Sequence, residues 1–173
     1  MTPPLPKPQA VLTNTDGARF DLGPATEGDV TLLFFGYTHC PDVCPLHMAH
    51  LASALKRLPA PVRDRIKLVF ITTDTVRDDP KSLRAWLDHF DKRFIGLTGS
   101  EAEIAAAQSS AHVPQARQSG TTHAAFILAY TKDNLAHVIY PFGVTDVDWL
   151  HDLPQLVKED WIAPPSWRPG AAR

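Results

Sequence analysis

The chain has 173 residues, a length typical of one domain. Its 17 Lys and Arg residues nearly balance its 19 Asp and Glu residues, and this net charge of −2 excludes a nucleic-acid-binding protein that works by bulk positive charge. The only two cysteines are Cys40 and Cys44, which excludes a scaffold of several disulfides. The pair is therefore two incidental buried thiols, a single disulfide, a redox couple or a metal site.

Proline marks both ends of the chain. Pro3, Pro4, Pro6 and Pro8 favour an extended linker over residues 1–9, and a second proline-rich segment follows over residues 161–173. We therefore predict a single domain over residues 10–160. The longest apolar runs, 31–37 and 124–130, are far shorter than the ~20 residues of a membrane-spanning helix. The start also lacks the basic and apolar regions of a signal peptide.

Strands and helices alternate along the predicted domain. The turn signal at Thr15, Asp16 and Gly17 predicts a hairpin over residues 10–22. Short apolar runs predict further strands, at residues 31–37, 66–72, 94–97, 124–130 and 136–142. Apolar residues at helical spacing predict helices at residues 45–58, from Pro80 onward, at 101–111 and at 147–158, the last interrupted in register by Pro154.

This order predicts an α/β fold. Strands that alternate with helices pair in parallel, and a terminal hairpin adds antiparallel partners. With both cysteines at the first strand–helix junction, the pattern indicates a thioredoxin-like fold with a central mixed sheet flanked by helices, plus the N-terminal hairpin.

Cys40 and Cys44 lie where the strand at 31–37 gives way to the helix at 45–58. Four-residue spacing brings both sulfur atoms to one side of the helix start, and the positive end of the helix dipole favours the thiolate there. Disulfide oxidoreductases favour two intervening residues rather than the three found here, although a disulfide remains geometrically possible. Soft thiolates select Cu(I), with Zn(II) as competitor, and two Cys with one His suit copper better than structural zinc.

The string F-F-G-Y-T-H-C-P-D-V-C-P, residues 34–45, resembles the signature of the SCO/SenC family. Residues 69–80 resemble that family's strand–Asp–R-D-x-P segment, and residues 121–126 fall where the family carries its metal-binding histidine. The resemblance runs from about Leu22 to Lys158. It implies a thioredoxin-fold copper protein, tethered outside the cytoplasm, that assists assembly of the dinuclear copper site of cytochrome c oxidase.

The same resemblance implies the site residues. Cys40 and Cys44 would supply thiolates, and His123 an imidazole, to one copper ion per monomer, as Cu(I) or Cu(II). Asp74 would support these ligands or contact the partner protein. Thr122 and Ala124 stand where the family usually has Asp and Ser, so the groups that orient His123 differ from the family pattern.

Other residues near the cysteines have plainer interpretations. His39 could tune the neighbouring thiolate, and His47 and Met48 are within reach of Cys44 on a helix, but such residues are more often exposed or part of the core. Asp74 either caps the helix that Pro80 opens or fixes the loop facing the cysteines. Arg77 and Asp78 are predicted to form a solvated pair in that loop.

We expect a copper metallochaperone that passes copper to the oxidase subunit carrying the dinuclear copper site. The alternative is a thiol–disulfide reductase that keeps that subunit's copper-ligand cysteines reduced, with Cys40 attacking and Cys44 resolving. The absence of proline from residues 120–123, where thioredoxins place a cis-proline, weighs against a general oxidoreductase. A peroxidase would need one activated cysteine supported by a Thr or by a Gln/Trp constellation, and the sequence shows no convincing match. A purely structural domain would leave the cysteine motif without a role.

Partners and location follow from the resemblance. Besides the oxidase subunit, other copper chaperones or thiol reductants are expected partners, and nucleic acid is not. We expect a periplasmic location or one on the outer face of the cell membrane, with a membrane anchor ahead of residue 1 in the full-length form. The protein is expected to transfer metal primarily, with thiol–disulfide oxidoreductase activity as a possible second role.

Overall fold

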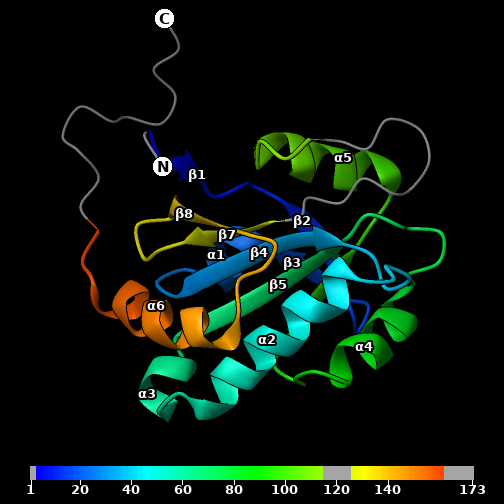
Figure 1. Cartoon of the computed structure of the whole chain (residues 1–173). Helices are drawn as coiled ribbons and strands as arrows, with labels where there is room; N and C mark the ends of the chain where they lie inside the picture. The colour runs from blue at the N-terminus through cyan, green and yellow to red at the C-terminus, as the bar shows by residue number, and fades with distance from the viewer. Residues whose placement is uncertain (1–2, 115–125, 162–173) are drawn as a thin grey trace, which may run out of the picture.

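The computed structural model describes residues 3–114 and 126–161 (Figure 1). Within those residues, eight strands form one mixed sheet in the order β1-β8-β7-β4-β5-β6-β2-β3. The strands in chain order are β1 (Leu5–Pro6), β2 (Val11–Asn14), β3 (Arg19–Asp21), β4 (Val30–Gly36), β5 (Ile66–Thr72), β6 (Ile95–Thr98), β7 (Phe126–Tyr130) and β8 (Leu135–Pro141).

The sheet combines parallel and antiparallel pairs. β4, β5 and β6 are parallel neighbours, whereas β7 runs antiparallel to β4, and β8 antiparallel to β7. The predicted N-terminal hairpin is β2–β3, which joins the sheet through β6. The predicted thioredoxin-like α/β fold, with its central mixed sheet and N-terminal hairpin, is confirmed.

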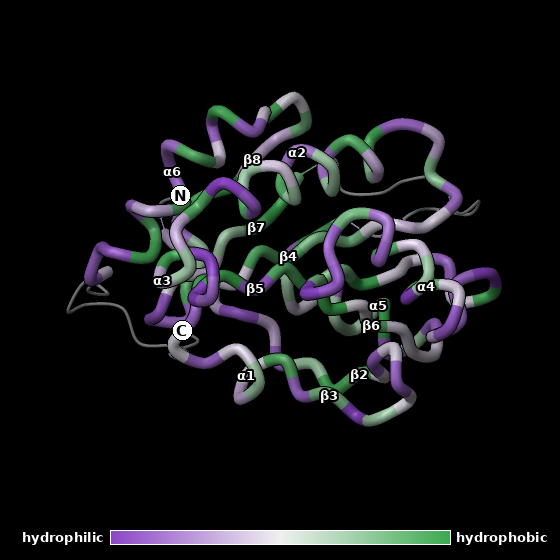
Figure 2. Tube along the Cα trace, turned by 90° about the horizontal axis from the view of Figure 1, so that it is seen from below, coloured by the Kyte–Doolittle hydropathy of each residue, from purple (hydrophilic) through white to green (hydrophobic). Residues whose placement is uncertain are grey.

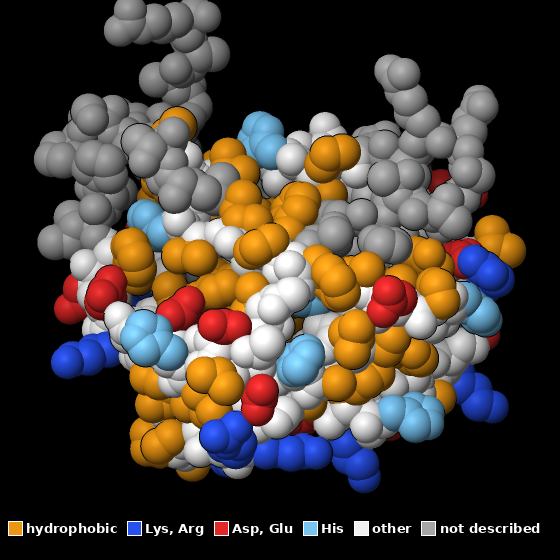
Figure 3. All heavy atoms as spheres, in the orientation of Figure 1, with side chains coloured by type: hydrophobic (Ala, Val, Ile, Leu, Met, Phe, Trp, Pro, Cys, Tyr) orange, Lys and Arg blue, Asp and Glu red, His pale blue; other side chains and the backbone are white. Residues whose placement is uncertain are grey.

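Helices cover both faces of this sheet. They are α1 (Leu22–Ala25), α2 (Val43–Arg57), α3 (Ala60–Arg63), α4 (Pro80–Asp88), α5 (Glu101–Ser110) and α6 (Asp146–Lys158). Figure 1 shows α2, α3, α4 and α6 on one side of the sheet and α5 on the other. Figure 3, in the same orientation as Figure 1, shows hydrophobic side chains gathered across the middle of the face in view and Lys and Arg along its lower rim.

The central strand β4 separates two hydrophobic cores. All seven of its residues are buried, as expected for a strand covered on both faces. Leu32 and Phe34 belong to the core under α2, α4 and α6, whereas Leu33 and Phe35 belong to the core shared with α5. Figure 2 shows a mainly hydrophobic trace along β4 and alternating colours along the helices. β4 and β5 are parallel, so the loops that follow them lie at one edge of the sheet.

Pro154 does not interrupt the last helix, so that prediction is wrong. α6 runs from Asp146 to Lys158 with Pro154 inside it. Proline removes one backbone hydrogen bond from a helix. Here the buried side chains of Trp149, Leu153 and Leu156 anchor α6 on both sides of the proline, so packing holds the helix through it.

Part of the proline-rich start packs onto the domain. Leu5 and Pro6 form β1, which pairs with β8 at the edge of the sheet, where a strand tolerates proline. Buried Lys7 donates from Nζ to the hydroxyls of Thr26 and Thr31, at 3.0 Å each. The division of the chain at residues 9–10 and 160–161 stays a prediction. Among the helices of residues 3–114 and 126–161, none combines the length and hydrophobicity needed to cross a bilayer.

Candidate metal centre

The two cysteines lie side by side at the start of α2. Cys40 is in the loop between β4 and α2, and Cys44 is in the first turn of the helix. The backbone N–H of Cys44 donates to Sγ of Cys40 at 3.4 Å. Cys40 is 5% exposed and Cys44 is fully buried, and both are free thiols. The predicted placement at a strand–helix junction is confirmed.

Gly36, the last residue of β4, lets Cys44 pack against the strand. A Cβ at position 36 would lie 2.9 Å from Sγ of Cys44 and 2.7 Å from Cε1 of Phe34. Such contacts are closer than packed atoms allow, so only glycine fits without displacing the sulfur. After Gly36 the chain turns, and the N–H of Cys40 donates to the carbonyl of Tyr37 at 3.2 Å.

The two thiols differ in acidity. Burial opposes ionisation of Cys40, but hydrogen bonds from the backbone N–H groups of Asp42 and Cys44, together with contacts to the Cys44 and Tyr37 side chains, bring its pKa below the usual thiol range. Burial raises the pKa of Cys44 far above that range, and the neighbouring Cys40 adds to the effect. Cys40 is therefore the sulfur that ionises first.

Asp78 holds the cysteine loop in place, a role that the sequence analysis missed. Its side chain is completely buried. It accepts hydrogen bonds from the N–H of Thr38 at 2.9 Å, from the hydroxyl of Thr38 at 2.5 Å and from the hydroxyl of Thr72 at 2.6 Å. The prediction of a solvated Arg77–Asp78 pair is wrong. Thr72, a polar residue at the end of the apolar strand β5, is a local sign that a polar partner lies inside.

Asp74 lies in the same loop and binds Arg77. Its carboxylate accepts hydrogen bonds from Nε and from the backbone N–H of Arg77. It does not cap α4, because Asp79 is the N-cap and accepts from the N–H of Ser82 at 2.7 Å. The Asp74 side chain is only 11% exposed, and Arg77 is its ion-pair partner. Its support of the ligands or of a partner contact stays a prediction.

The alternative ligands on α2 belong to the core. Met48 is fully buried, and the His47 ring packs between Phe34 and Phe142, with ring centroids 5.3 and 5.8 Å away. His39, which is half exposed, has Nδ1 3.0 Å from the hydroxyl of Thr38 and 3.7 Å from Asp78. Its ring is therefore hydrogen-bonded to Thr38 and lies near the carboxylate that fixes the loop.

His123 lies outside the described residues, between 114 and 126. Phe126, three residues after it, begins β7 beside β4. Within the described ranges, 3–114 and 126–161, no three His, Cys, Asp or Glu side chains gather as a metal site. The described part of the centre thus consists of two thiols, Tyr37, and the network of Asp78.

Comparison with known proteins identifies the family to which this chain belongs. The family model of SCO1/SenC matches residues 7–157, nearly the whole of the described domain. The chain belongs to the SCO1/SenC family. The predicted membership is therefore confirmed, and the match begins at residue 7, ahead of the Leu22 where the motifs placed its start.

Three relatives illustrate the range of the family. The "Putative copper-binding protein" of Stutzerimonas stutzeri is 41% identical over 73 residues, covering 42% of this chain and 36% of its own. The copper-bound structure of Bradyrhizobium japonicum ScoI has a TM-score of 0.74 at 30% identity, covering 88% of this chain and 99% of its own. BsSco, described with a disulfide switch and as a member of the Sco family of cytochrome c oxidase assembly proteins, has a TM-score of 0.69 at 21% identity, covering 91% and 98%.

This chain matches only part of the length of its curated relatives. The matched segments span 36%, 33% and 38% of the first curated relatives, including human "Protein SCO2 homolog, mitochondrial". The chain therefore matches about a third of the length of these proteins.

Proposed function

We propose that the protein is a copper chaperone that holds one copper ion through Cys40, Cys44 and His123 and delivers it to the dinuclear copper site of cytochrome c oxidase. The observation that carries this proposal is the pair of free thiols at the start of α2, where the backbone N–H of Cys44 donates to Sγ of Cys40. Copper is the cargo of this activity. The copper-bound structure of a Sco relative supports copper as the metal.

The chemistry of the donor set fits Cu(I). Thiolates are soft ligands, and Cu(I) accepts few of them, whereas a structural zinc site closes with four. Ionised Cys40 would bind first, and Cys44, which is held neutral by burial, would lose its proton as it bonds to the metal. A site with few ligands leaves room for a partner's thiolates to attack the metal, so copper can pass on by ligand exchange.

The position of β7 supports His123 as the third ligand. β7 pairs with β4 in antiparallel register, with Leu128 opposite Leu33. The start of β7 therefore faces the end of β4, from which the cysteine loop leaves. Phe126 is three positions after His123, a span of about 10 Å when extended. This supports His123 as the third ligand.

An apolar surface next to the cysteine loop suits protein docking. Leu46 and Phe142 are 42% and 46% exposed, and they line one hollow with His47. An apolar hollow beside the cysteine loop supports contact with a partner protein there. The proposed partner is the oxidase subunit, and the proposed location is the periplasm or outer face of the membrane, with an anchor in the full-length form. The lipoprotein among the solved Sco relatives supports the tether.

A second candidate function is supported by the unequal acidity of the thiols. In a reductase, the Cys40 thiolate would attack a disulfide of the oxidase subunit and form a mixed disulfide. Cys44 would then give up its proton and attack Cys40, releasing the reduced partner dithiol and leaving a Cys40–Cys44 disulfide. An external dithiol would reduce that disulfide again. Both functions use the same reduced pair, so copper loading and redox state are linked.

An anaerobic Cu(I) titration against a competing chelator tests the chaperone. Wild-type protein should bind one Cu(I) per chain, and Cys40→Ser/Cys44→Ser protein should bind none, with an unchanged circular dichroism spectrum. His123→Ala should weaken Cu(II) binding more than Cu(I) binding, because imidazole suits the harder ion better. Equal Cu(I) affinity in wild type and double variant would rule out the proposal. The reductase is tested separately, by the rate at which an oxidase-subunit peptide disulfide is reduced relative to free dithiol.

A further inference from the structure

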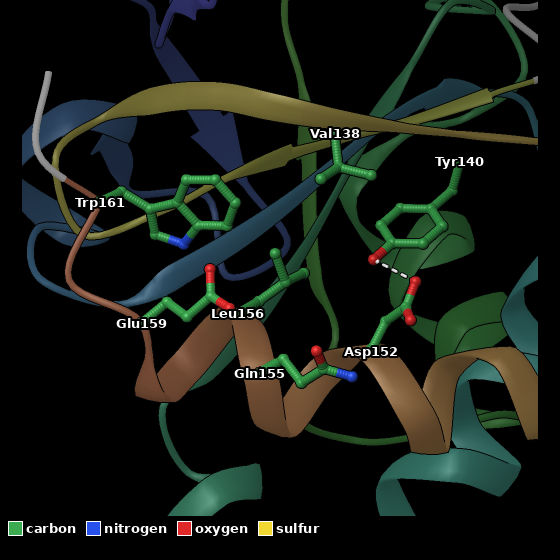
Figure 4. Close-up of a pocket in the computed structure, with 7 residues that line it drawn as sticks. All are labelled: Val138, Tyr140, Asp152, Gln155, Leu156, Glu159 and Trp161. Atoms are coloured by element: carbon green, nitrogen blue, oxygen red, sulfur yellow. Dashed lines mark hydrogen bonds between the residues drawn. The ribbon is translucent and has the colours of Figure 1, made fainter. Parts of the chain in front are cut away.

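A pocket of about 190 Å³ lies between β8 and α6 (Figure 4). It is smaller than the ~300–1,000 Å³ of pockets for drug-sized ligands, so its occupant is about the size of one side chain. The residues that matter for its chemistry come from β8, from α6 and from the segment that follows α6, and they are Val138, Tyr140, Asp152, Leu156, Glu159 and Trp161.

The pocket is separate from the cysteine centre. Val138 pairs with Ala129 of β7, and Ala129 lies opposite Leu32 near the start of β4. The cysteines follow the opposite end of β4. No function proposed above uses this pocket.

Two aromatic side chains form its ends. The Trp161 ring stacks on His137, with centroids 4.4 Å apart and an interplanar angle of 24°. The Tyr140 ring packs on Trp149 with centroids 4.2 Å apart. Figure 4 shows the two rings at opposite ends, with Leu156 between them. Each ring is thus braced by a second ring, and Val138 and Leu156 complete an apolar wall.

One polar group in the pocket is a donor in need of an acceptor. Nε1 of Trp161 is buried and has no hydrogen-bond partner among the described residues. An unpaired buried N–H is unfavourable, so a ligand that brings an oxygen to it is favoured. A peptide carbonyl or a carboxylate supplies that oxygen.

The charge of the pocket is negative. Asp152 and Glu159 line it, and none of its lining residues is Lys or Arg. Asp152 already accepts from the Tyr140 hydroxyl at 3.0 Å and lies 2.7 Å from Nδ1 of exposed His151. Glu159 has no side-chain hydrogen bond or ion pair within the described residues. Lys132 pairs at 2.8 Å with Asp160, a residue that does not line the pocket.

We infer that this pocket binds the guanidinium group of an arginine residue in a peptide segment of another protein. The planar cation would stack on the Trp161 indole and pair with the Glu159 carboxylate, and the peptide backbone would give its carbonyl to Nε1 of Trp161. Arginine suits the pocket better than lysine, because its flat and weakly hydrated group matches both an aromatic face and a carboxylate. A strongly hydrated metal ion does not suit walls made of Trp161, Val138 and Leu156.

The experiment uses the full chain and N-acetyl-arginine methylamide as the probe, followed by the ¹H–¹⁵N signal of the Trp161 indole. A saturable shift with a dissociation constant on the order of 1 mM is expected. The citrulline analogue, which has the same shape without the charge, should bind at least ~10-fold more weakly. Methylguanidinium, which lacks the carbonyl, should also bind more weakly. An unmoved indole signal, or equal binding of either analogue, overturns the inference.

Two glutamates in different parts of the fold provide a matched pair of variants. Glu159→Gln should weaken binding of the probe at least ~5-fold, because it removes the charge inside the pocket. Glu101→Gln makes the same change in the first turn of α5, outside the pocket, and should leave binding unchanged. Equal weakening by both variants would reduce the effect to bulk charge and overturn the inference. Cys40→Ser/Cys44→Ser protein should bind the probe as wild type does, so failure of the copper proposal is seen separately.

Discussion

The carboxylate of Asp78 binds Thr38 twice, through the backbone N–H at 2.9 Å and through the hydroxyl at 2.5 Å. These residues are 40 positions apart in the sequence. Thr38 stands two residues before Cys40, so the conformation of the cysteine loop depends on a residue in the loop after β5. The hydroxyl of Thr72 gives Asp78 its third hydrogen bond and ties both loops to the sheet.

Replacing Asp78 should therefore weaken both the fold and the copper site. Asp78→Asn places an amide N–H₂ among three donors, and leaving buried donors unpaired costs roughly 2–3 kcal/mol of unfolding free energy. Cu(I) affinity should fall by about 10–100-fold, as it does when groups that position metal ligands are removed. Urea unfolding and anaerobic chelator competition measure the two effects.

Asp79→Asn is the matched control for this variant. It makes the same charge change one residue later, and asparagine caps a helix as well as aspartate does. Its stability and Cu(I) affinity should stay close to those of wild type. If Asp78→Asn behaved like Asp79→Asn in both measurements, the buried network would not be what positions the cysteine loop.

Gly36→Ala tests the packing of Cys44 against β4. The new methyl group would meet Sγ of Cys44 at 2.9 Å and Phe34 at 2.7 Å, so the sulfur or the ring must move. Overpacking of this kind costs about 1–3 kcal/mol, and Cu(I) should bind more weakly because Cys44 is displaced. Gly23→Ala is the comparison, since a Cβ there meets nothing closer than 3.8 Å. Equal stability of the two variants would contradict the close approach at Gly36.

Local pattern predicted the elements of this fold well, because each strand and helix carries its own period of apolar residues. The strand at 66–72 matches β5 in both bounds, and the helix opened by Asp79 begins at Pro80. The motif placed the cysteines at the right junction. The sequence could not predict that Asp78 binds Thr38. Asp78 lies in an Asp-rich loop, where a carboxylate is expected to be solvated, and only the pairing of β4 with β5 brings that loop to the cysteine loop.

The last helix, α6, also depends on tertiary packing that the sequence does not show. Proline inside a helix is unfavourable by itself, and the sequence does not show that Trp149 and Leu153 are buried against the sheet. The packing of these side chains keeps α6 continuous through Pro154. The site residues divide likewise: Cys40 and Cys44 follow from a local motif, whereas Asp78 follows only from tertiary contacts.

Alkylation should distinguish the two thiols. Cys40 has a lowered pKa and slight exposure, whereas Cys44 is fully buried and has a raised pKa. Iodoacetamide reacts with thiolates, so Cys40 should be modified first at neutral pH, and its rate should fall as the pH drops below its pKa. Peptide mass spectrometry after short exposures gives the two rates. Modification of Cys44 at the rate of Cys40 would show that the helix start is open to solvent.

Lys7 should make stability depend on pH in the alkaline range. Burial lowers its pKa to about 8 in the folded protein, against 10.5 as the reference value, with Asp29 and Glu27 opposing the shift. Between these two values the unfolded chain binds more protons than the folded one, so the contribution of Lys7 to stability rises with pH across that window and is smallest below it. Urea unfolding of wild type and Lys7→Met at several pH values from neutral to 10 isolates this effect. Wild type should gain stability relative to Lys7→Met as the pH rises. A constant difference between the two proteins would mean that Lys7 keeps its ordinary pKa when its Nζ binds Thr26 and Thr31.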